Sequence, residues 1–175
     1  MRIYVCVKHV PDTAARITIL GKDRIDERVT FIMNPYDENA VEEAARYKGS
    51  VDDAEVIAVT LGTPAAEATL RSALAMGADR GIFIKTDGHP DSMVTAAALK
   101  AAIESDGKPG IIFTGKESID SEGFQTMFRL GAALDIPVAT NVVAFTYDGE
   151  FVEVECEMEA GGKESPGEVE IQYRM

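Results

Sequence analysis

Residues 55–77 of this chain read EVIAVTLGTPAAEATLRSALAMG, which predicts one strand followed by one helix. Residues 55–61 form a mostly apolar run, as is typical of a strand buried on both faces of a parallel sheet. The turn that follows predicts a helix capped by Thr63 and ended by Gly77. The helical side chains expected to face the sheet are Leu70, Ala73 and Leu74.

The same order of strand and helix recurs on both sides of this segment. The further strand-like apolar runs are residues 3–7, 81–85 and 110–115. A third helix is expected to be capped by Asp91 or Ser92, and a fourth to run over about residues 122–134. This alternation predicts an α/β fold: a doubly wound, mostly parallel, Rossmann-like sheet covered by helices on both faces.

The helix expected after residue 34 has clear start and stop signals. Asn34 is expected to cap it, and Pro35 suits its first position. Asp37 and Glu38 lie where the positive end of a helix favours acids, and Gly49 is expected to end the helix. We therefore expect this helix to begin next to the end of a strand.

The sequence after Pro137 predicts a C-terminal β-hairpin. Residues 141–147 and 151–156 flank Asp148-Gly149, a dipeptide that favours a two-residue turn. In the second arm Val152, Val154, Cys156 and Met158 share one face. Glu153, Glu155, Glu157 and Glu159 share the other, which we interpret as a solvated face rather than a docking surface. We expect one domain over residues 1–162 and a loose, atypical tail over residues 163–175.

The chain is acidic, with 17 Lys and Arg against 30 Asp and Glu and a formal net charge of −13. Residues 148–175 hold nine acids and two bases, and so supply −7 of that charge. Such a balance disfavours nucleic acid and anionic membranes as partners. Two cysteines give no disulfide framework, and neither a signal peptide nor a membrane-spanning run is visible. We expect a cytoplasmic protein without membrane insertion.

No catalytic constellation stands out in the sequence. His9 and His89 do not have a metal-ligand spacing, and we find no nucleophile elbow, Walker A motif or G-x-G-x-x-G. An enzyme acting on a small substrate therefore has no support, and no catalytic or metal-binding residue is expected. Cys6 fits a small buried apolar residue.

Residues 114–126, TGKESIDSEGFQT, are the segment most suited to a ligand. They follow a predicted parallel strand and lead into a helix, the place where open α/β sheets bind phosphates. Gly115 and Gly123 would allow close approach to a ligand, and the hydroxyls of Ser118, Ser121 and Thr126 could donate hydrogen bonds. A well-capped loop without a ligand is an equally good interpretation. Cys6, Lys8 and the Asn34-Pro35 helix start could lie at the same edge of the sheet.

The sequence resembles the beta subunit of electron transfer flavoprotein, also called the FixA family. The likeness covers residues 1–162. It rests on an ordered set of segments: VCVKHVPDT at 5–13, NPYDENAVEEA at 34–44, LRSALAMGADR at 70–80, GKESID at 115–120 and EMEAGG at 157–162. Family members usually have Gly-Lys/Arg-Gln-Ala-Ile-Asp where Glu117 and Ser118 stand here, and Ser121 and Glu122 also depart from the usual pattern.

The resemblance implies an adenine nucleotide hydrolase-like fold and a heterodimer with an alpha subunit that holds a redox-active FAD. It implies an adenine nucleotide in this subunit, AMP in many members and FAD in electron-bifurcating ones. The implied cofactor-binding residues are Cys6, Asn34, Pro35, Tyr36, Asp37, Leu61, Gly115, Lys116, Glu117, Ser118, Ile119, Asp120, Ser121, Glu122, Gly123, Phe124, Gln125 and Thr126. The turn Pro11-Asp12-Thr13 would approach the flavin of the alpha subunit.

By this likeness the protein carries electrons from acyl-CoA-type or other flavin dehydrogenases to an acceptor and has no substrate chemistry of its own. Family members continue past a Gly-Gly such as Gly161-Gly162 into a further strand, a dehydrogenase-recognition loop and a C-terminal arm. We therefore expect the docking loop to be absent from these residues. The alternative hypothesis is a stand-alone adenine-nucleotide-binding regulatory module similar to universal stress proteins.

Overall fold

The computed structural model of the chain describes residues 1–22, 24–26, 28–147, 151–158 and 167–174. The chain divides into two compact units, residues 1–134 and residues 135–175. The α-helices of the described residues all belong to the first unit.

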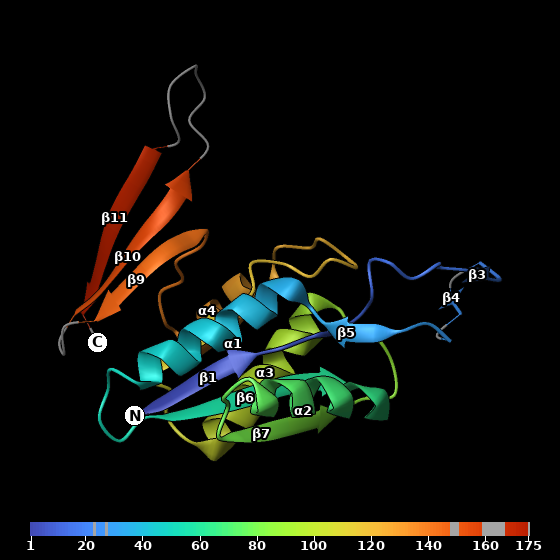
Figure 1. Cartoon of the computed structure of the whole chain (residues 1–175), viewed down its shortest axis with the longest axis horizontal. Helices are drawn as coiled ribbons and strands as arrows, with labels where there is room; N and C mark the ends of the chain where they lie inside the picture. Colours follow the sequence, from blue (N-terminus) through green and yellow to red (C-terminus); the bar gives the residue numbers. More distant parts are fainter. Residues whose placement is uncertain (23, 27, 148–150, 159–166, 175) are drawn as a thin grey trace. The chain divides into compact units, whose positions relative to one another are not determined.

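Four parallel strands form the main sheet of the first unit (Figure 1). They are β1 (Arg2–Cys6), β6 (Glu55–Gly62), β7 (Arg80–Lys85) and β8 (Ile111–Thr114), in the order β7-β6-β1-β8. β1 is central: Tyr4 lies opposite Ile57 on one side and Ile112 on the other. Its side chains are buried on both faces, as its apolar run predicts, and the expected doubly wound α/β sheet is confirmed.

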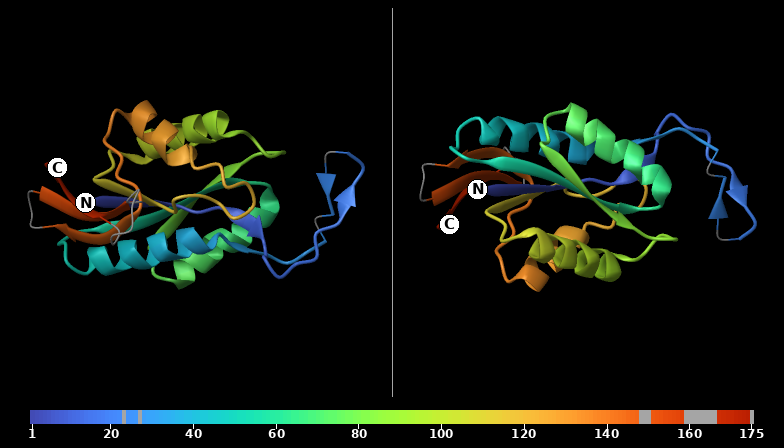
Figure 2. Two further views of the ribbon diagram at one scale, coloured as in Figure 1. Left: turned by 90° about the horizontal axis from the view of Figure 1, so that it is seen from above. Right: turned by 90° about the horizontal axis from the view of Figure 1, so that it is seen from below.

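Two helices cover each face of this sheet (Figure 2). α1 (Pro35–Lys48) and α2 (Glu67–Ala75) lie on one face, and α3 (Ser92–Asp106) and α4 (Thr126–Leu134) lie on the other. Tyr4, which is fully buried, packs in one apolar cluster with Leu99, Ile103 and Leu130. This burial of apolar surface holds the layers together. None of the described helices is long and apolar enough to cross a lipid bilayer.

Three features of the helices after α1 differ from the expectations. Thr63 makes no side-chain cap, and a short 3-10 helix, Pro64–Ala66, precedes α2. Leu74, expected to face the sheet, is 39% exposed. α4 begins at Thr126 rather than near Glu122, because Glu122 and Phe124 have φ values of 45° that no α-helix accepts. Asp91, by contrast, caps α3 through Met93 and Val94, as expected.

The described residues between 9 and 33 form an arm that extends beyond the sheet (Figure 2). At its base β2 (His9–Pro11) pairs antiparallel with β5 (Phe31–Met33). At its far end β3 (Ile19–Leu20) pairs antiparallel with β4 (Arg24–Ile25). Two short antiparallel pairings thus hold the arm.

The second unit is a three-stranded antiparallel sheet. Its strands are β9 (Val142–Tyr147), β10 (Phe151–Met158) and β11 (Gly167–Arg174), in the order β11-β10-β9. Val152, Val154 and Cys156 are buried on one face of β10, whereas Glu155 and Glu157 are exposed. The expected pairing of β9 with β10 is confirmed; the Asp148-Gly149 turn, the side chain of Met158 and Glu159 lie outside the described residues.

Residues 167–174, within the tail expected to be loose, form β11. The strand pairs with β10 along its whole length, and Val169 and Ile171 lie opposite Cys156 and Val154. The expectation of looseness over these residues is therefore corrected. Residues 168–173 alternate Glu-Val-Glu-Ile-Gln-Tyr, a period of two that indicates a strand once a partner for it is available.

Candidate functional site

Several of the residues predicted for the site lie at the carboxyl ends of β1 and β8. Along the chain the strands run outward from β1 to β6 and β7, and the next strand, β8, returns to the other side of β1. The order of the sheet therefore reverses between β1 and β8. Such a switch point is where doubly wound sheets open a crevice for ligands.

Asp37, in the first turn of α1, joins the ends of both strands. Its Oδ2 accepts a hydrogen bond from the backbone N–H of Lys8 at 2.8 Å, and its Oδ1 accepts one from the backbone N–H of Gly115 at 3.1 Å. The residue is 6% exposed. Burial raises the pKa of this carboxyl to about 7, although both N–H donors and the Asn34 side chain favour its charged form.

Asn34 connects α1 with the loop that follows β8. Its Nδ2 donates to the carbonyl oxygen of Glu117 at 2.8 Å, and its Oδ1 accepts from the backbone N–H of Ile119 at 3.1 Å. The expected side-chain cap of α1 is absent. The side chain instead binds the loop, which sequence periodicity could not reveal because these partners lie more than 80 positions away.

Gly115 lies against the first turn of α1. A Cβ at this position would overlap the Asp37 carboxylate and lie 2.7 Å from Cβ of Tyr36. This glycine was expected to let a ligand approach the backbone closely. In the structure it lets the first turn of α1 approach instead. Next to it, the Lys116 ammonium lies over the Tyr36 ring, 5.2 Å from its centroid.

A small polar cluster lies where the loop meets the end of β1. Lys8 Nζ donates to Ser118 Oγ at 3.0 Å and to Asp120 Oδ1 at 2.7 Å. Ser118 Oγ and Ser121 Oγ are 2.8 Å apart. Burial raises the pKa of Asp120, but hydrogen bonds from Lys8 and Ser118 outweigh it and keep this pKa below its usual value. The cluster therefore contains one ammonium, two hydroxyls and one carboxylate.

Cys6 ends β1 and packs against the apolar cluster around Tyr4. Burial, with a smaller contribution from the Asp37 charge, raises the pKa of its thiol to about 12. The thiol is protonated at neutral pH and is a poor nucleophile. Cys6 is half-buried, so it fits the expected small apolar residue in its packing but is not fully buried.

The remaining predicted residues lie around this centre. Leu61 lies near the carboxyl end of β6, in register with Ile84. Glu122 and Gly123 are exposed, and Thr126 begins α4. Phe124 packs edge to face on Phe128 at 5.6 Å, and Gln125 accepts hydrogen bonds from Ser92 and Arg129. Pro35 is exposed at the first position of α1.

The predicted turn Pro11-Asp12-Thr13 lies at the base of the arm. Asp12 donates its backbone N–H to Thr30 at 2.9 Å and accepts from Ala14 through Oδ1 at 2.9 Å. Close by, the His9 ring stacks on Phe31 at 4.6 Å and contacts Thr69 Oγ1 through Nδ1 at 2.7 Å. Burial lowers the pKa of His9, so this ring is a neutral structural contact at neutral pH.

The donor set suits an anionic oxygen ligand. Lys8, Ser118 and Ser121 supply an ammonium and two hydroxyls, and the loop leads into the amino-terminal end of α4. Phosphates are bound by such groups. Among the described residues, no group of three or more His, Cys, Asp and Glu side chains is arranged to hold a metal ion.

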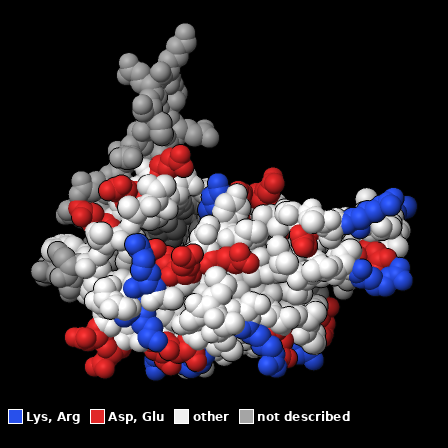
Figure 3. All heavy atoms as spheres, in the orientation of Figure 1, with Lys and Arg blue, Asp and Glu red and all other residues white. Residues whose placement is uncertain are grey.

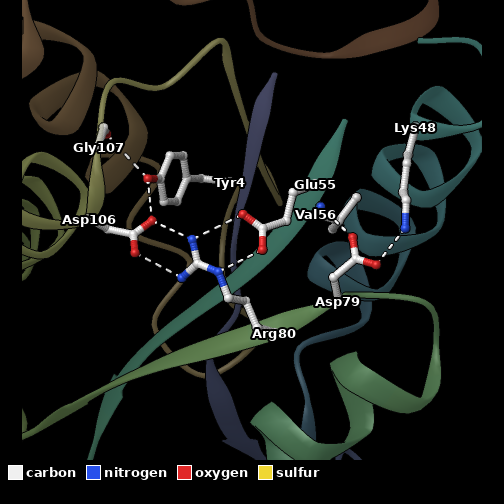
Figure 4. Close-up of polar contacts among 8 residues, drawn as sticks. All are labelled: Tyr4, Lys48, Glu55, Val56, Asp79, Arg80, Asp106 and Gly107. Carbon is white, nitrogen blue, oxygen red and sulfur yellow. Dashed lines mark hydrogen bonds and ion pairs between the residues drawn. The ribbon is translucent and has the colours of Figure 1, made fainter. Parts of the chain in front are cut away.

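Another polar cluster lies at the opposite, amino-terminal end of the sheet (Figure 4). Arg80 donates to both carboxylate oxygens of Glu55 and of Asp106, and Tyr4 donates its hydroxyl to Asp106. Asp79 accepts from Lys48 and from the backbone of Val56. The segment GADR at residues 77–80 is one of the motifs that resemble the family. Through Asp79 and Arg80 it links strands and helices by hydrogen bonds at the end of the sheet opposite the candidate site.

The fold defines the chain as a doubly wound α/β protein with a Rossmann-like sheet order. Residues 24–164 match the family described as the electron transfer flavoprotein domain. The chain belongs to this family.

Named relatives agree with this assignment. The chain is 37% identical to an electron transfer flavoprotein subunit beta of Bradyrhizobium diazoefficiens and 36% identical to one of Dictyostelium discoideum. Each match covers 92% of this chain and 65% of the relative. The chain is also 39% identical to Protein FixA of Sinorhizobium fredii, over 83% of this chain and 53% of that protein. The chain thus spans between 53% and 65% of the length of these relatives.

Proposed function

We propose that this chain is the nucleotide-binding part of an electron transfer flavoprotein beta subunit. It binds an adenine nucleotide, AMP or FAD, at the switch point between β1 and β8. It pairs with an alpha subunit that holds FAD, and the pair carries electrons from dehydrogenases to an acceptor. Membership of the family and the names of its relatives support the electron-transfer role.

One observation carries the nucleotide site. Three segments far apart in sequence meet at the switch point, and the side chains of Asn34, Asp37 and Lys8 bind them together. These hydrogen bonds hold the loop against a strand end and a helix in the absence of a ligand. The shape of the loop is therefore fixed before a ligand arrives, which lowers the entropy cost of binding.

Lys8 is the residue we assign to the phosphate. Its ammonium is 2.7 Å from Asp120 and its side chain is 44% exposed, so a phosphate oxygen can reach it from solvent. Ser118 and Ser121 lie beside it as hydroxyl donors. When a nucleotide is bound, its phosphate would share or take over the place of Asp120 as the partner of Lys8.

The arm supports a protein partner. Ile17, Ile19, Leu20 and Ile25 are 45%, 72%, 46% and 37% exposed, an unusual amount of apolar surface on so short a segment. The space-filling view of Figure 3 shows basic side chains at the end of this arm on an otherwise acidic protein. An apolar surface rimmed by charge is typical of a protein interface.

We further propose that the subunit has no substrate chemistry of its own. The thiol of Cys6 is protonated, and His9 is engaged by Phe31 and Thr69. Redox chemistry would belong to the flavin held mainly by the alpha subunit.

The test is co-expression with an alpha-type subunit. We expect an equimolar yellow complex with flavin absorbance, from which denaturation releases AMP or FAD, identified by chromatography. The variant Ser121→Ala should retain less nucleotide, whereas Ser72→Ala, exposed on α2, should retain the wild-type amount. A colourless chain that binds ATP and ignores the alpha subunit would contradict the proposal and favour the stand-alone regulatory module.

A further inference from the structure

The side chains of Asn34 and Asp37 are directed at protein backbone rather than at open space. Together they make four hydrogen bonds, to Lys8, Gly115, Glu117 and Ile119. They are 1% and 6% exposed. Side chains this buried and this fully engaged are poorly placed to bind a nucleotide directly.

Asn34 binds the loop in the manner of a neighbouring strand. Its amide donates to one backbone carbonyl and accepts from one backbone N–H two residues later. Both loop groups would otherwise need another partner, because an unpaired buried polar group is costly. The Asn34 side chain makes these bonds instead of capping α1. This choice indicates that the contact with the loop stabilises the fold more than a cap would.

Asp37 fixes the other end of the same loop. The Lys8 and Gly115 N–H groups point at its two oxygens from the two strands that border the switch point. The titratable groups that interact with it are the Cys6 thiol at the end of β1 and the Lys8 ammonium just beyond that strand. Gly115 leaves no room for a side chain between loop and helix, so the two are in close contact at this position.

We propose that Asn34 and Asp37 are positioning residues, which hold residues 115–119 against the end of β1 in the shape that the nucleotide needs. The inference deepens the proposed function and rests on it for the nucleotide. The polar contacts to phosphate then come from Lys8 and the loop. The first turn of α1 sets where that loop lies.

The first measurement is residue-resolved hydrogen exchange on the ligand-free chain. In the wild type the amides of Gly115 and Ile119 should be clearly more protected than that of Gly123, which is exposed at the far part of the loop. Asn34→Ala should speed exchange at Ile119 by about tenfold, and Asp37→Asn should do so at Gly115. Protection in β6 should stay at the wild-type level.

Matched controls lie on the same helix. Asn39→Ala and Glu38→Gln change an exposed amide and an exposed acid of α1, and should leave loop exchange unchanged. Unchanged loop exchange in both Asn34→Ala and Asp37→Asn, or equal loss of protection in the loop and β6, would overturn the positioning role. If either variant does not fold, the wild-type comparison of Gly115 and Ile119 with Gly123 decides: equal exchange rates overturn the proposal.

The second measurement is AMP binding by calorimetry. We expect Asn34→Ala and Asp37→Asn to raise the dissociation constant by about tenfold, with wild-type affinity in Asn39→Ala and Glu38→Gln. If a variant shows faster amide exchange in residues 115–119 but binds AMP with wild-type affinity, the shape of the loop does not determine nucleotide binding, and that part of the proposal is overturned. If the wild type itself binds neither AMP nor FAD, the proposed function fails, and the exchange data still decide separately whether Asn34 and Asp37 hold the loop.

Discussion

Arg80, at the start of β7, and Asp106, at the end of α3, face each other through two parallel hydrogen bonds of 2.8 and 2.7 Å (Figure 4). Arg80 binds Glu55 in the same way from its other side. One guanidinium thus joins two neighbouring strands and a helix at the amino-terminal end of the sheet. Planar two-point pairing of this kind is available to arginine and not to lysine.

Replacing Arg80 by Lys should therefore destabilise the chain. We expect a loss of about 1–3 kcal/mol in the free energy of unfolding, because lysine cannot replace the paired hydrogen bonds to Glu55 and Asp106. The loss is no larger because these groups are partly exposed and solvent screens their charges. Urea denaturation measures it. Arg71→Lys, at an exposed pair with Glu67 on α2, serves as the control and should change stability by less than about 0.5 kcal/mol. Equal effects of both substitutions would show that the geometry at Arg80 contributes nothing.

Tyr4 should resist ionisation in alkaline solution. Burial, then the hydrogen bond and charge of Asp106, raise its pKa to about 12 from an ordinary 10. The folded state therefore keeps a proton that the unfolded state loses, and this contribution to stability disappears as pH rises through that range. Unfolding measured from pH 9 upward should show a steeper loss in the wild type than in Tyr4→Phe. Parallel curves would contradict the assignment.

Asp37 should make the folded chain less stable as pH rises, whereas most carboxylates in proteins make it more stable. Its pKa in the folded state is raised to about 7, above the value of about 4 expected in the unfolded state. The folded state therefore binds the extra proton between these values, and stability falls as pH rises through the range. Relative to Asp37→Asn, the wild type should lose free energy of unfolding between about pH 4 and pH 7. A constant difference between the two proteins would count against this shift.

The two glycines of the loop should respond differently to alanine. Gly115→Ala places a methyl group into the Asp37 carboxylate and the Tyr36 side chain, so we expect a loss of about 1–3 kcal/mol in stability. Gly123 has open space where a Cβ would lie, and Gly123→Ala should be nearly neutral. Thermal unfolding of both variants checks this. If neither substitution lowered the stability, the first turn of α1 and the loop could move apart at little cost in free energy.

The apolar arm should matter to the complex and not to the isolated chain. Ile19 is 72% exposed, so Ile19→Asp should leave the free energy of unfolding within about 0.5 kcal/mol of the wild type. It should weaken association with the alpha subunit, measured by size-exclusion chromatography of co-expressed proteins. Thr18→Asp, also exposed on the arm, adds the same charge without removing an apolar side chain. Wild-type association of Ile19→Asp would place the interface elsewhere.

The order of strands and helices could be predicted because each element carries its own periodic signal. Apolar runs such as residues 3–7 and 55–61 indicate buried strands whatever surrounds them. Errors gathered at element ends, where local rules compete with distant contacts. Asn34 has the residue type of a helix cap, yet its side chain binds the loop at Glu117 and Ile119.

The sequence by itself determined the fold class, the family and the end of the sheet at which a ligand site was to be expected, because these follow from local periodicity and ordered motifs. Tertiary structure alone decided how the site residues act. The pairing of Asp37 with Lys8 and Gly115, and of Lys8 with Asp120, joins positions 29 to 112 residues apart. Hydrogen bonds depend on distance and direction in space, and those are set only when the sheet brings the ends of β1 and β8 together.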